Sequence, residues 1–359
     1  MTNDRSKPNL LHVCLAEGYG GLEKFFLTSS NYLKERFNVR LLIKKGSDLE
    51  PRVRETDFNY STLRFINYID VRAMYRIRSI VQKNNIDCVY FQGSSELGLI
   101  VPALLGLDVK LLNRKSVTVT SSKKDFYHDL IYNGVDEFVA PTPYFKENLL
   151  EKYPVDEEKI NVIPNAIEIE RFRKSTYPSI LEDFHEKDDH TFITSLSRVV
   201  PEKGIESFVK MANHFARKNP KHVFFVVGDG PDHFLSELRQ IRDDSLGDRI
   251  IFTGFQENVP AVLNQTDLFV SFARHEHFGN NILEAKTMGL PILASNTVAA
   301  QFHLKEYPEF IVEHSKLEDR DLLETKISDL VKQYPTVKYD LEPFQYDTYV
   351  SDIERLARK

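Results

Sequence analysis

The chain has 359 residues, of which 42% are hydrophobic and 28% charged, and its formal net charge is −6. This length allows two ordinary domains with separate cores, and the composition is that of a globular protein. The first apolar run, residues 10–16, is only of strand length. The uncharged stretch 97–107 spans about 11 residues, against the roughly 20 that a membrane span needs. We therefore predict neither a signal peptide nor a transmembrane helix.

The cysteines indicate the redox compartment of the protein, and the distribution of charge bears on its binding partners. Cys14 and Cys88 each fall inside an apolar run, which favours buried free thiols in a reducing compartment. Residues 1–174 carry 26 Lys and Arg against 23 Asp and Glu, and the remainder carries 21 against 30. The mildly basic first half suits an anionic acceptor or a membrane surface, and it equally suits ordinary solvated helix faces.

Short apolar runs alternate with amphipathic segments through the first half of the chain. Helix patterns cover residues 21–36 and 72–84. The expected strands are 10–15, 39–43, 88–91, 110–112, 137–140 and 161–163. This alternation predicts a parallel sheet with helices on both faces.

A second series of the same kind follows a polar segment, residues 171–190, which is typical of a connection between domains. Its expected strands are 191–197, 222–228, 250–253, 268–271, 291–295 and 310–312. We therefore predict an α/β protein with two doubly wound parallel-sheet domains in tandem. Because such sheets bind ligands beyond the carboxyl ends of their strands, we expect the site in the cleft between the domains.

Three glycine- or proline-containing segments follow expected strands in the first two thirds of the chain. They are GYGGLE at 18–23, VIPNAIEIERF at 162–172 and VVGDGP at 226–231. Glycines in such turns let the backbone approach a ligand closely. The spacing in the first segment is not G-x-G-x-x-G, so a nicotinamide cofactor is not implied. A lone glycine-rich turn is more often structural than functional.

Two further segments carry charge at expected strand ends. Arg198 and Lys203 lie in SRVVPEKG, on the loop leading into a helix near Gly204, where a cation is disfavoured unless an anion lies nearby. Such a pair can neutralise a diphosphate leaving group without a metal. Farther along, Glu276 and Glu284 flank a helix start near Asn280 or Asn281, where backbone N–H groups suit a phosphate.

Taken in order, these segments resemble the retaining glycosyltransferases of family 4 (glycosyl transferases group 1), which have the GT-B fold. The resemblance is carried by Gly20-Gly21-Leu22-Glu23, Val162-Ile163-Pro164-Asn165-Ala166-Ile167-Glu168, Arg198 with Lys203-Gly204, Gly228-Asp229-Gly230-Pro231, and Glu276-His277-Phe278-Gly279 with Glu284-Ala285, Gly289 and Pro291. It implies two Rossmann-like domains facing a central cleft. The expected acceptor domain is 1–170, joined by a C-terminal helix at 344–359, and the expected donor domain is 171–343.

The resemblance also implies roles for individual residues. Arg198 and Lys203 hold and stabilise the departing diphosphate, and Glu276 lies beside the transferred sugar. Glu284 binds the ribose hydroxyls. The remaining expected donor contacts are Gly20, Gly21, Gly254, Phe255, Phe278, Gly279, Asn280 and Asn281. No metal and no cofactor are expected, since the donor, a UDP- or GDP-linked sugar, is a substrate.

The sequence departs from the family pattern at several positions. Ala299-Ala300 stand where a glycine pair is usual, and His303 stands where an acid is usual. In the first domain Asn113-Arg114-Lys115 replace a common histidine, so Arg114, Lys115 or the nearby His128 are candidates to meet a phosphorylated or lipid-linked acceptor.

The expected function is transfer of a sugar from a nucleotide diphosphate donor to an acceptor hydroxyl with retention, in cell-surface polysaccharide or lipopolysaccharide assembly. Expected partners are the donor and a saccharide or lipid-linked acceptor, without nucleic acid. The expected location is the cytoplasm, either free or peripheral to the inner membrane face. Two alternatives remain: a sugar-nucleotide isomerase of the same architecture, which turns over without acceptor, and a catalytically silent nucleotide-sugar binding protein.

Overall fold

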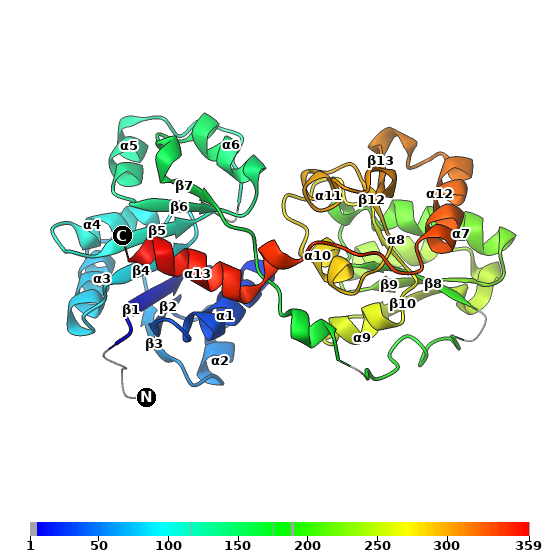
Figure 1. The fold of residues 1–359 in the computed structure, drawn as a ribbon, viewed down its shortest axis with the longest axis horizontal. Helices are drawn as coiled ribbons and strands as arrows, with labels where there is room; N and C mark the ends of the chain where they lie inside the picture. Colours follow the sequence, from blue (N-terminus) through cyan, green and yellow to red (C-terminus); the bar gives the residue numbers. More distant parts are fainter. Residues whose placement is uncertain (1–5, 116, 175, 188–189, 359) are drawn as a thin grey trace. The chain divides into compact units, whose positions relative to one another are not determined.

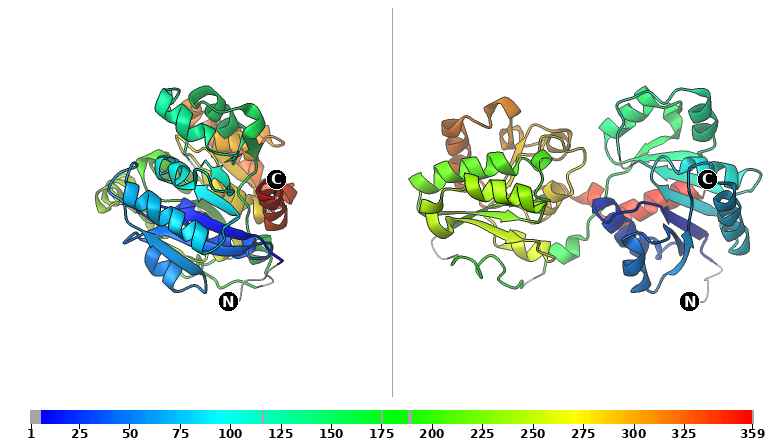
Figure 2. Two further views of the ribbon diagram at one scale, coloured as in Figure 1. Left: turned by 90° about the vertical axis from the view of Figure 1, so that its left-hand side faces the viewer. Right: turned by 180° about the vertical axis from the view of Figure 1, so that it is seen from behind.

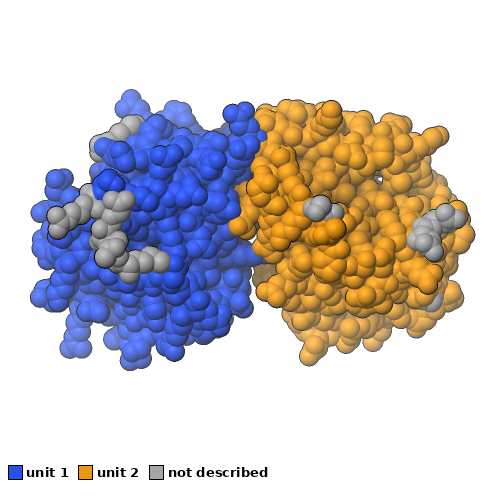
Figure 3. All heavy atoms as spheres, turned by 60° about the horizontal axis from the view of Figure 1, so that its bottom comes forward, with its two compact units in different colours: residues 1–166, 342–359 blue, residues 167–341 orange. Residues whose placement is uncertain are grey.

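The computed structural model describes residues 6–115, 117–174, 176–187 and 190–358. The chain divides into two compact units (Figure 3). Unit 1 comprises residues 1–166 and 342–359, and unit 2 comprises residues 167–341. Each unit is a parallel sheet with helices packed on it (Figure 1). Within the described residues, every helix is too short or too polar to cross a lipid bilayer.

Unit 1 contains a seven-stranded sheet in the order β3-β2-β1-β4-β5-β6-β7, with every neighbouring pair parallel. Its strands are β1 Asn9–Cys14, β2 Asn38–Lys44, β3 Asn59–Leu63, β4 Cys88–Gln92, β5 Lys110–Arg114, β6 Glu137–Ala140 and β7 Ile160–Val162. Its α-helices are α1 Gly21–Leu33, α2 Leu49–Arg54, α3 Val71–Lys83, α4 Leu97–Leu104, α5 Phe126–Asn133, α6 Pro143–Lys152 and α13 Tyr346–Ala357.

The helices of unit 1 cover both faces of its sheet. Helices α3 to α6 share one core with the sheet, whereas α1 and α13 share another. The C-terminal helix α13 buries Ile353 and Leu356 completely, and its Tyr349 hydroxyl lies 2.9 Å from the hydroxyl of Tyr90 on β4. The last helix of the chain therefore belongs to the core of the first unit.

Unit 2 contains a six-stranded parallel sheet in the order β10-β9-β8-β11-β12-β13. Its strands are β8 Thr191–Leu196, β9 His222–Val227, β10 Ile250–Gly254, β11 Leu268–Ser271, β12 Ile292–Ser295 and β13 Ile311–Val312. Its α-helices are α7 Ile205–Lys218, α8 Asp232–Ile241, α9 Val259–Asn264, α10 Asn280–Thr287, α11 Val298–His303 and α12 Arg320–Gln333. The chain moves outward in one direction from β8 to β10 and in the other from β11 to β13.

The two doubly wound parallel sheets confirm the predicted fold class. One strand was missed in the sequence, β3, because its segment NYSTL contains no apolar run. It lies at the edge of the sheet, where only Leu63 of its five residues is buried. An edge strand with one buried side chain leaves little hydrophobic signal.

Unit 1 contains a buried histidine, His12 on β1. Its Nδ1–H donates to Ser30 Oγ at 2.7 Å, and its Nε2 accepts from Gln92 Nε2 at 2.9 Å. Burial, assisted by the charge of Arg114, lowers the pKa of His12 to about 3. The side chain is therefore neutral in the folded protein.

We expect this histidine to make unit 1 sensitive to acid. Below a pH of about 6.5 the unfolded chain takes up a proton at His12 that the folded chain does not. The free energy of unfolding therefore has its full value above that pH. It falls by up to about 1.4 kcal/mol per pH unit as the pH drops towards the pKa of His12 in the folded protein. Urea unfolding at several pH values should show this slope, and His12→Gln should flatten it. An equal slope in both proteins would contradict the assignment.

Candidate active site

The residues predicted to bind the diphosphate and the transferred sugar in unit 2 lie at the centre of its sheet, on the loops that follow β8 and β11 and on the start of α10. These strands are hydrogen-bonded neighbours, and the chain winds away from them in opposite directions. Two adjacent strands with diverging connections leave a crevice at their carboxyl ends, where doubly wound sheets bind ligands. Arg198 and Lys203 come from the first loop, and residues 276–279 come from the second.

An ion pair joins the two loops. The Lys203 ammonium group contacts Glu276 Oε2, and both side chains are about one-fifth exposed. The backbone of the same loops is also linked, because the Arg274 N–H donates to the Glu202 carbonyl at 2.8 Å. Lys203 precedes helix α7, where a cation is unfavourable unless an anion lies nearby. In this structure the Glu276 carboxylate is that anion.

Glycines allow these loops to pack backbone against backbone. Gly204 has φ +67°, and a Cβ placed on it would lie 1.8 Å from the Phe272 carbonyl oxygen. Gly228, at the end of β9, has φ +138°, and its Cβ would lie 1.8 Å from the Ser197 carbonyl oxygen. Any side chain at these positions would force the loops apart.

Three other predicted donor-binding residues lie on the loop after β8 or on helix α10. Arg198 is exposed, and its side chain makes no hydrogen bond or ion pair with any part of the chain that the structure describes. Asn281 Nδ2 donates to the Leu196 carbonyl at 3.1 Å, which fastens the start of α10 to the end of β8. Glu284 lies one turn farther along α10 and is partly exposed.

Helix α10 begins at Asn280, where the sequence predicted a helix start. The residue before it, Gly279, has φ +75° and is the N-cap. A left-handed residue is needed there, and glycine adopts it without strain. The Phe278–Asn280 backbone thus turns sharply into the helix directly after Glu276.

Helix α11 packs against the loop that carries Glu276. This helix contains Ala299, Ala300 and His303, the residues that depart from the family pattern. The Ala299 N–H donates to the Glu276 carbonyl at 3.0 Å, and a Cβ on Gly279 would lie 2.9 Å from the Ala299 Cβ. His303 is buried, and its Nε2–H donates to the Phe278 carbonyl at 2.6 Å. Burial, together with the charge of Lys286, lowers the pKa of His303 to about 3, so this donor is neutral.

We expect His303 to position the loop that carries Glu276. His303→Leu removes the donor to the Phe278 carbonyl and should reduce kcat/KM for the donor sugar by about tenfold, the effect of roughly 1.4 kcal/mol. His303→Gln keeps an N–H near the same place and should recover most of the activity. If Gln and Leu lower kcat/KM equally, the hydrogen bond has no positioning role.

The predicted base-binding residues lie at the end of β10. Gly254 has φ +71° with open space around its Cβ direction, and its carbonyl accepts the Gly228 N–H at 2.9 Å. Phe255 follows with its side chain 72% exposed. An exposed aromatic ring at the carboxyl edge of the sheet is available to stack on a base.

Gly20 and Gly21 lie in unit 1, at the start of α1. Gly20 is the N-cap residue, and its N–H donates to Glu23 Oε2 at 2.7 Å. This capping contact gives the turn a structural role. Their contact with the donor stays a prediction.

The three acceptor candidates in unit 1 are placed differently from the expectation. Arg114 is buried, contacts Asn165 Oδ1 and lies over the Phe25 ring. Lys115 is also buried, and its Nζ donates to Tyr132 OH at 2.9 Å. Neither cation is at the surface of this structure, and both contact residues in the core of unit 1. Their contact with an acceptor phosphate stays a prediction.

Burial also changes the charge state of Lys115. It lowers the pKa of the ammonium group to about 7, although Glu96 acts in the opposite direction. His128 is the third candidate, and its Nδ1 lies 2.6 Å from Asp125 Oδ2 at the start of α5. Asp125 caps that helix, so His128 takes part in a local helix-end contact.

One group of potential metal ligands lies among the described residues: His214, Asp321 and Glu324. The Nζ of Lys218 lies 2.6 Å from Glu324 and 3.7 Å from Asp321, so a cation of the protein already occupies this group. His214 and Lys218 lie in the second half of α7, which runs back from the carboxyl edge of the sheet. The group therefore lies away from Lys203 and Glu276.

Sequence reasoning missed the residues that support the loop. Lys286 is buried on α10, and its Nζ donates to the His303 carbonyl at 3.0 Å. No motif marks it, because a lysine in the middle of a helix usually faces solvent. The side chain of Asn281 was also missed as a link to β8, since only its backbone was assigned to the donor.

Two Rossmann-like parallel-sheet units, one with charged and glycine-rich loops at its switch point, have the architecture of the GT-B fold. The comparison with protein families is in agreement. Residues 19–171 match the family described as Glycosyltransferase Family 4, and residues 178–336 match Glycosyl transferases group 1. The chain is therefore a glycosyltransferase composed of these two domains.

Relatives of known activity cover most of the chain. It is 26% identical over 335 residues to the UDP-Gal:alpha-D-GlcNAc-diphosphoundecaprenol alpha-1,3-galactosyltransferase of Escherichia coli, covering 87% of this chain and 86% of the relative. It is 25% identical over 290 residues to the Escherichia coli O-antigen biosynthesis glycosyltransferase WclY, covering 77% of this chain and 71% of the relative. Homologues thus act in O-antigen and related polysaccharide biosynthesis.

Solved structures share the fold over almost the full length. A glycosyltransferase from Rickettsia africae has a TM-score of 0.81 at 20% identity, with 98% of each chain covered. The Anabaena protein HepE, solved in complex with UDP and glucose, has a TM-score of 0.74 at 17% identity, covering 98% of this chain and 100% of its own.

Proposed function

We propose that the protein transfers a sugar from a UDP-sugar to a hydroxyl of a lipid-linked saccharide, with retention and without a metal. The observation that carries the proposal is the Lys203–Glu276 pair at the switch point of the unit 2 sheet, beside the exposed Arg198. The relative that acts on a diphosphoundecaprenol-linked acceptor with UDP-Gal, and HepE with bound UDP, support the choice of donor and acceptor.

The proposed reaction uses the charges of the two loops. The bond between the anomeric carbon and the diphosphate breaks, and the acceptor oxygen forms the new bond on the same face of the sugar. The acceptor proton passes to the departing phosphate oxygen. Arg198 and Lys203 stabilise the negative charge that develops on the diphosphate, which is the role that a divalent cation has in other enzymes.

Glu276 has two roles in this proposal. Its carboxylate holds the Lys203 ammonium group at the mouth of the sheet, and it faces the sugar, where it supports positive charge at the anomeric carbon. Glu284 binds the ribose hydroxyls, and the backbone N–H groups at Phe278–Asn281 bind sugar and phosphate at the start of α10.

The protein acts in the cytoplasm, at the inner face of the membrane.

A transfer assay tests the proposal. The purified chain is incubated with UDP-hexoses and GDP-hexoses, with and without a GlcNAc-diphospholipid acceptor, in the presence of EDTA. We expect acceptor-dependent product from a UDP-hexose, unaffected by EDTA, and an α-anomeric signal in the NMR spectrum of the product. Turnover without acceptor would favour the isomerase, and UDP binding without any turnover would favour a silent binding protein.

We expect Phe255 to stack on the donor base. Stacking of a base on an aromatic ring contributes roughly 1–3 kcal/mol, so Phe255→Ala should weaken UDP binding by about 5- to 150-fold. Phe184→Ala, which removes a 42% exposed ring elsewhere in unit 2, is the matched control. Titration calorimetry with UDP measures both, and equal affinities in the two variants would rule out the stacking role.

A further inference from the structure

Unit 1 exposes an unusual number of large apolar side chains. Fifteen large hydrophobic residues are exposed in the described chain; thirteen belong to unit 1, and only Phe184 and Phe255 belong to unit 2. Six of them, on or next to helices α3 and α5, form what we call the apolar face: Ile66 (91%), Ile69 (65%), Val71 (73%), Tyr75 (75%), Phe126 (83%) and Leu130 (62%). Single exposed hydrophobic residues are normal, but such a concentration in one unit marks an interaction site.

The members of the apolar face lie on neighbouring elements. Ile66 and Ile69 precede α3, Val71 and Tyr75 lie on its first two turns, and Phe126 and Leu130 lie on α5. Helix α4 contacts both α3 and α5, and the three lie on one face of the sheet (Figure 1, Figure 2).

The two ends of the apolar face meet over Gly98 at the start of α4. A Cβ on Gly98 would lie 2.4 Å from the Tyr127 hydroxyl and 2.7 Å from the Tyr68 carbonyl oxygen. Both tyrosines are themselves about 45% exposed, with Tyr68 at 45% and Tyr127 at 44%. The loop before α3 and the first turn of α5 therefore form one continuous surface.

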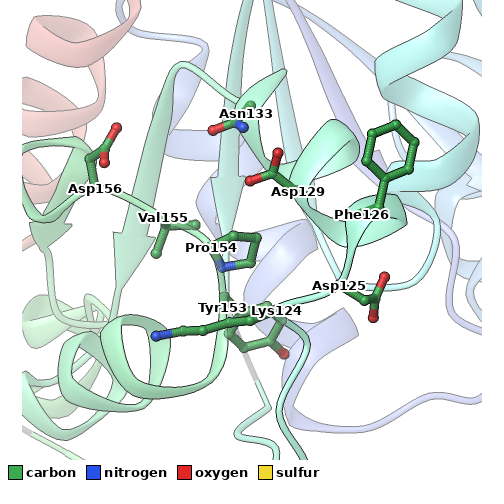
Figure 4. Close-up of a pocket in the computed structure, with 9 residues that line it drawn as sticks. All are labelled: Lys124, Asp125, Phe126, Asp129, Asn133, Tyr153, Pro154, Val155 and Asp156. Atoms are coloured by element: carbon green, nitrogen blue, oxygen red, sulfur yellow. The ribbon is translucent and has the colours of Figure 1, made fainter.

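These side chains protrude from the surface. In Figure 4 the Phe126 ring points away from the other residues that line a cavity of about 550 Å³ between α5 and residues 153–156. The polar side chains that line this cavity belong to Lys124, Asp125, Asp129, Asn133 and Asp156, and its apolar ones to Phe126, Tyr153, Pro154 and Val155. Although Phe126 borders the cavity, it remains 83% exposed. Protruding apolar side chains beside tyrosines are suited to insertion among lipid headgroups.

The charge on the α3 side of the apolar face is positive, although the whole chain has a net charge of −6. Segments 64–83 and 123–133 together contain seven Lys and Arg against three Asp. The excess lies on the α3 side, where Arg72 and Arg76 are both exposed and four residues apart on the helix. On the α5 side, Lys123 and Lys124 are balanced by Asp125 and Asp129.

We propose that the apolar face docks unit 1 on a lipid bilayer with anionic headgroups. Ile66, Ile69, Phe126 and Leu130 enter the headgroup region, and Arg72 and Arg76 contact lipid phosphates. The choice of an acceptor embedded in that bilayer rests on the proposed function, but binding to the bilayer does not.

Vesicle cosedimentation tests the docking. The full chain is mixed with phosphatidylcholine vesicles, with or without phosphatidylglycerol. We expect binding only to the anionic vesicles and a loss of at least tenfold in partitioning for the double variant Ile66→Ser/Ile69→Ser. Arg72→Gln/Arg76→Gln should lose roughly thirtyfold, about fivefold for each arginine, and should lower the salt dependence of binding.

Controls separate docking from misfolding and from the proposed function. Phe184→Ser, an exposed phenylalanine of unit 2, should sediment like the wild type. The thermal shift with UDP should be the same in all variants, because their substitutions lie outside unit 2 or away from its donor loops. Failure of the wild type to bind anionic vesicles, or binding of both double variants as strong as that of the wild type, would overturn the proposal. So would a wild-type dimer that the Ile66/Ile69 substitutions abolish, since a second copy would then cover the face. Cosedimentation needs no turnover, so it stands apart from the transfer assay.

Discussion

Lys203→Met is expected to lower kcat by about 100- to 1,000-fold, the usual effect of removing one preorganised group that stabilises charge in a transition state. The substitution keeps most of the side-chain volume but removes the ammonium group that contacts Glu276. It leaves the carboxylate without its partner at the place where the diphosphate is proposed to depart. Steady-state kinetics with a UDP-sugar and its acceptor measure the loss.

A matched control lies on the helix that follows. Lys210 on α7 forms an ion pair with Glu206 at 2.6 Å, and both side chains are 39% exposed. Exposed pairs of this kind contribute about 0–1 kcal/mol to stability. Lys210→Met should therefore leave kcat unchanged. Similar kinetics in the two variants would mean that Lys203 has no special role in the reaction.

Gly204→Ala is expected to destabilise unit 2 by more than about 3 kcal/mol or to prevent its folding. The new Cβ would lie 1.8 Å from the Phe272 carbonyl oxygen, and the backbone φ of +67° is already unfavourable for alanine. The loop that carries Lys203 would have to move, because that movement alone relieves both the clash with the Phe272 carbonyl and the unfavourable φ of the new alanine.

Gly254→Ala isolates the strain from the contact. Gly254 has a similar φ of +71° in the same unit, but nothing lies within 4 Å of its Cβ direction. Gly254→Ala should lower the free energy of unfolding by only about 1–2 kcal/mol, the effect of the left-handed conformation alone. Urea denaturation followed by circular dichroism compares the two, and equal losses would show that close packing at Gly204 is unimportant.

The fold was predictable because most strands are buried on both faces. Segments such as β4 (CVYFQ) and β9 (HVFFVV) are apolar except for one residue at an end, and every residue of each is buried. The missing strand β3 shows the limit of this signal, since an edge strand with four of its five residues at least partly exposed has the composition of a loop. Hydrophobic periodicity reports burial, and it identifies strands only where burial is continuous.

The candidate site was predictable as a set of loops but not as a set of contacts. The motifs place Lys203 and Glu276 after two strands, yet the neighbouring positions of β8 and β11 make them partners. Support from His303 and Lys286 depends on how α10 and α11 pack, which no local pattern encodes. The burial of Arg114 and Lys115 was missed for a related reason, because sequence alone treats a cation after a strand as exposed.

The central claim is that the loops after β8 and β11 receive a departing diphosphate. Calorimetric titration of the wild type, Lys203→Met and Arg198→Gln with UDP and with uridine tests it most directly. We expect UDP to bind at least tenfold more weakly to each variant, while the much weaker binding of uridine stays the same in all three proteins. UDP affinities that are equal in the wild type and both variants would contradict the account.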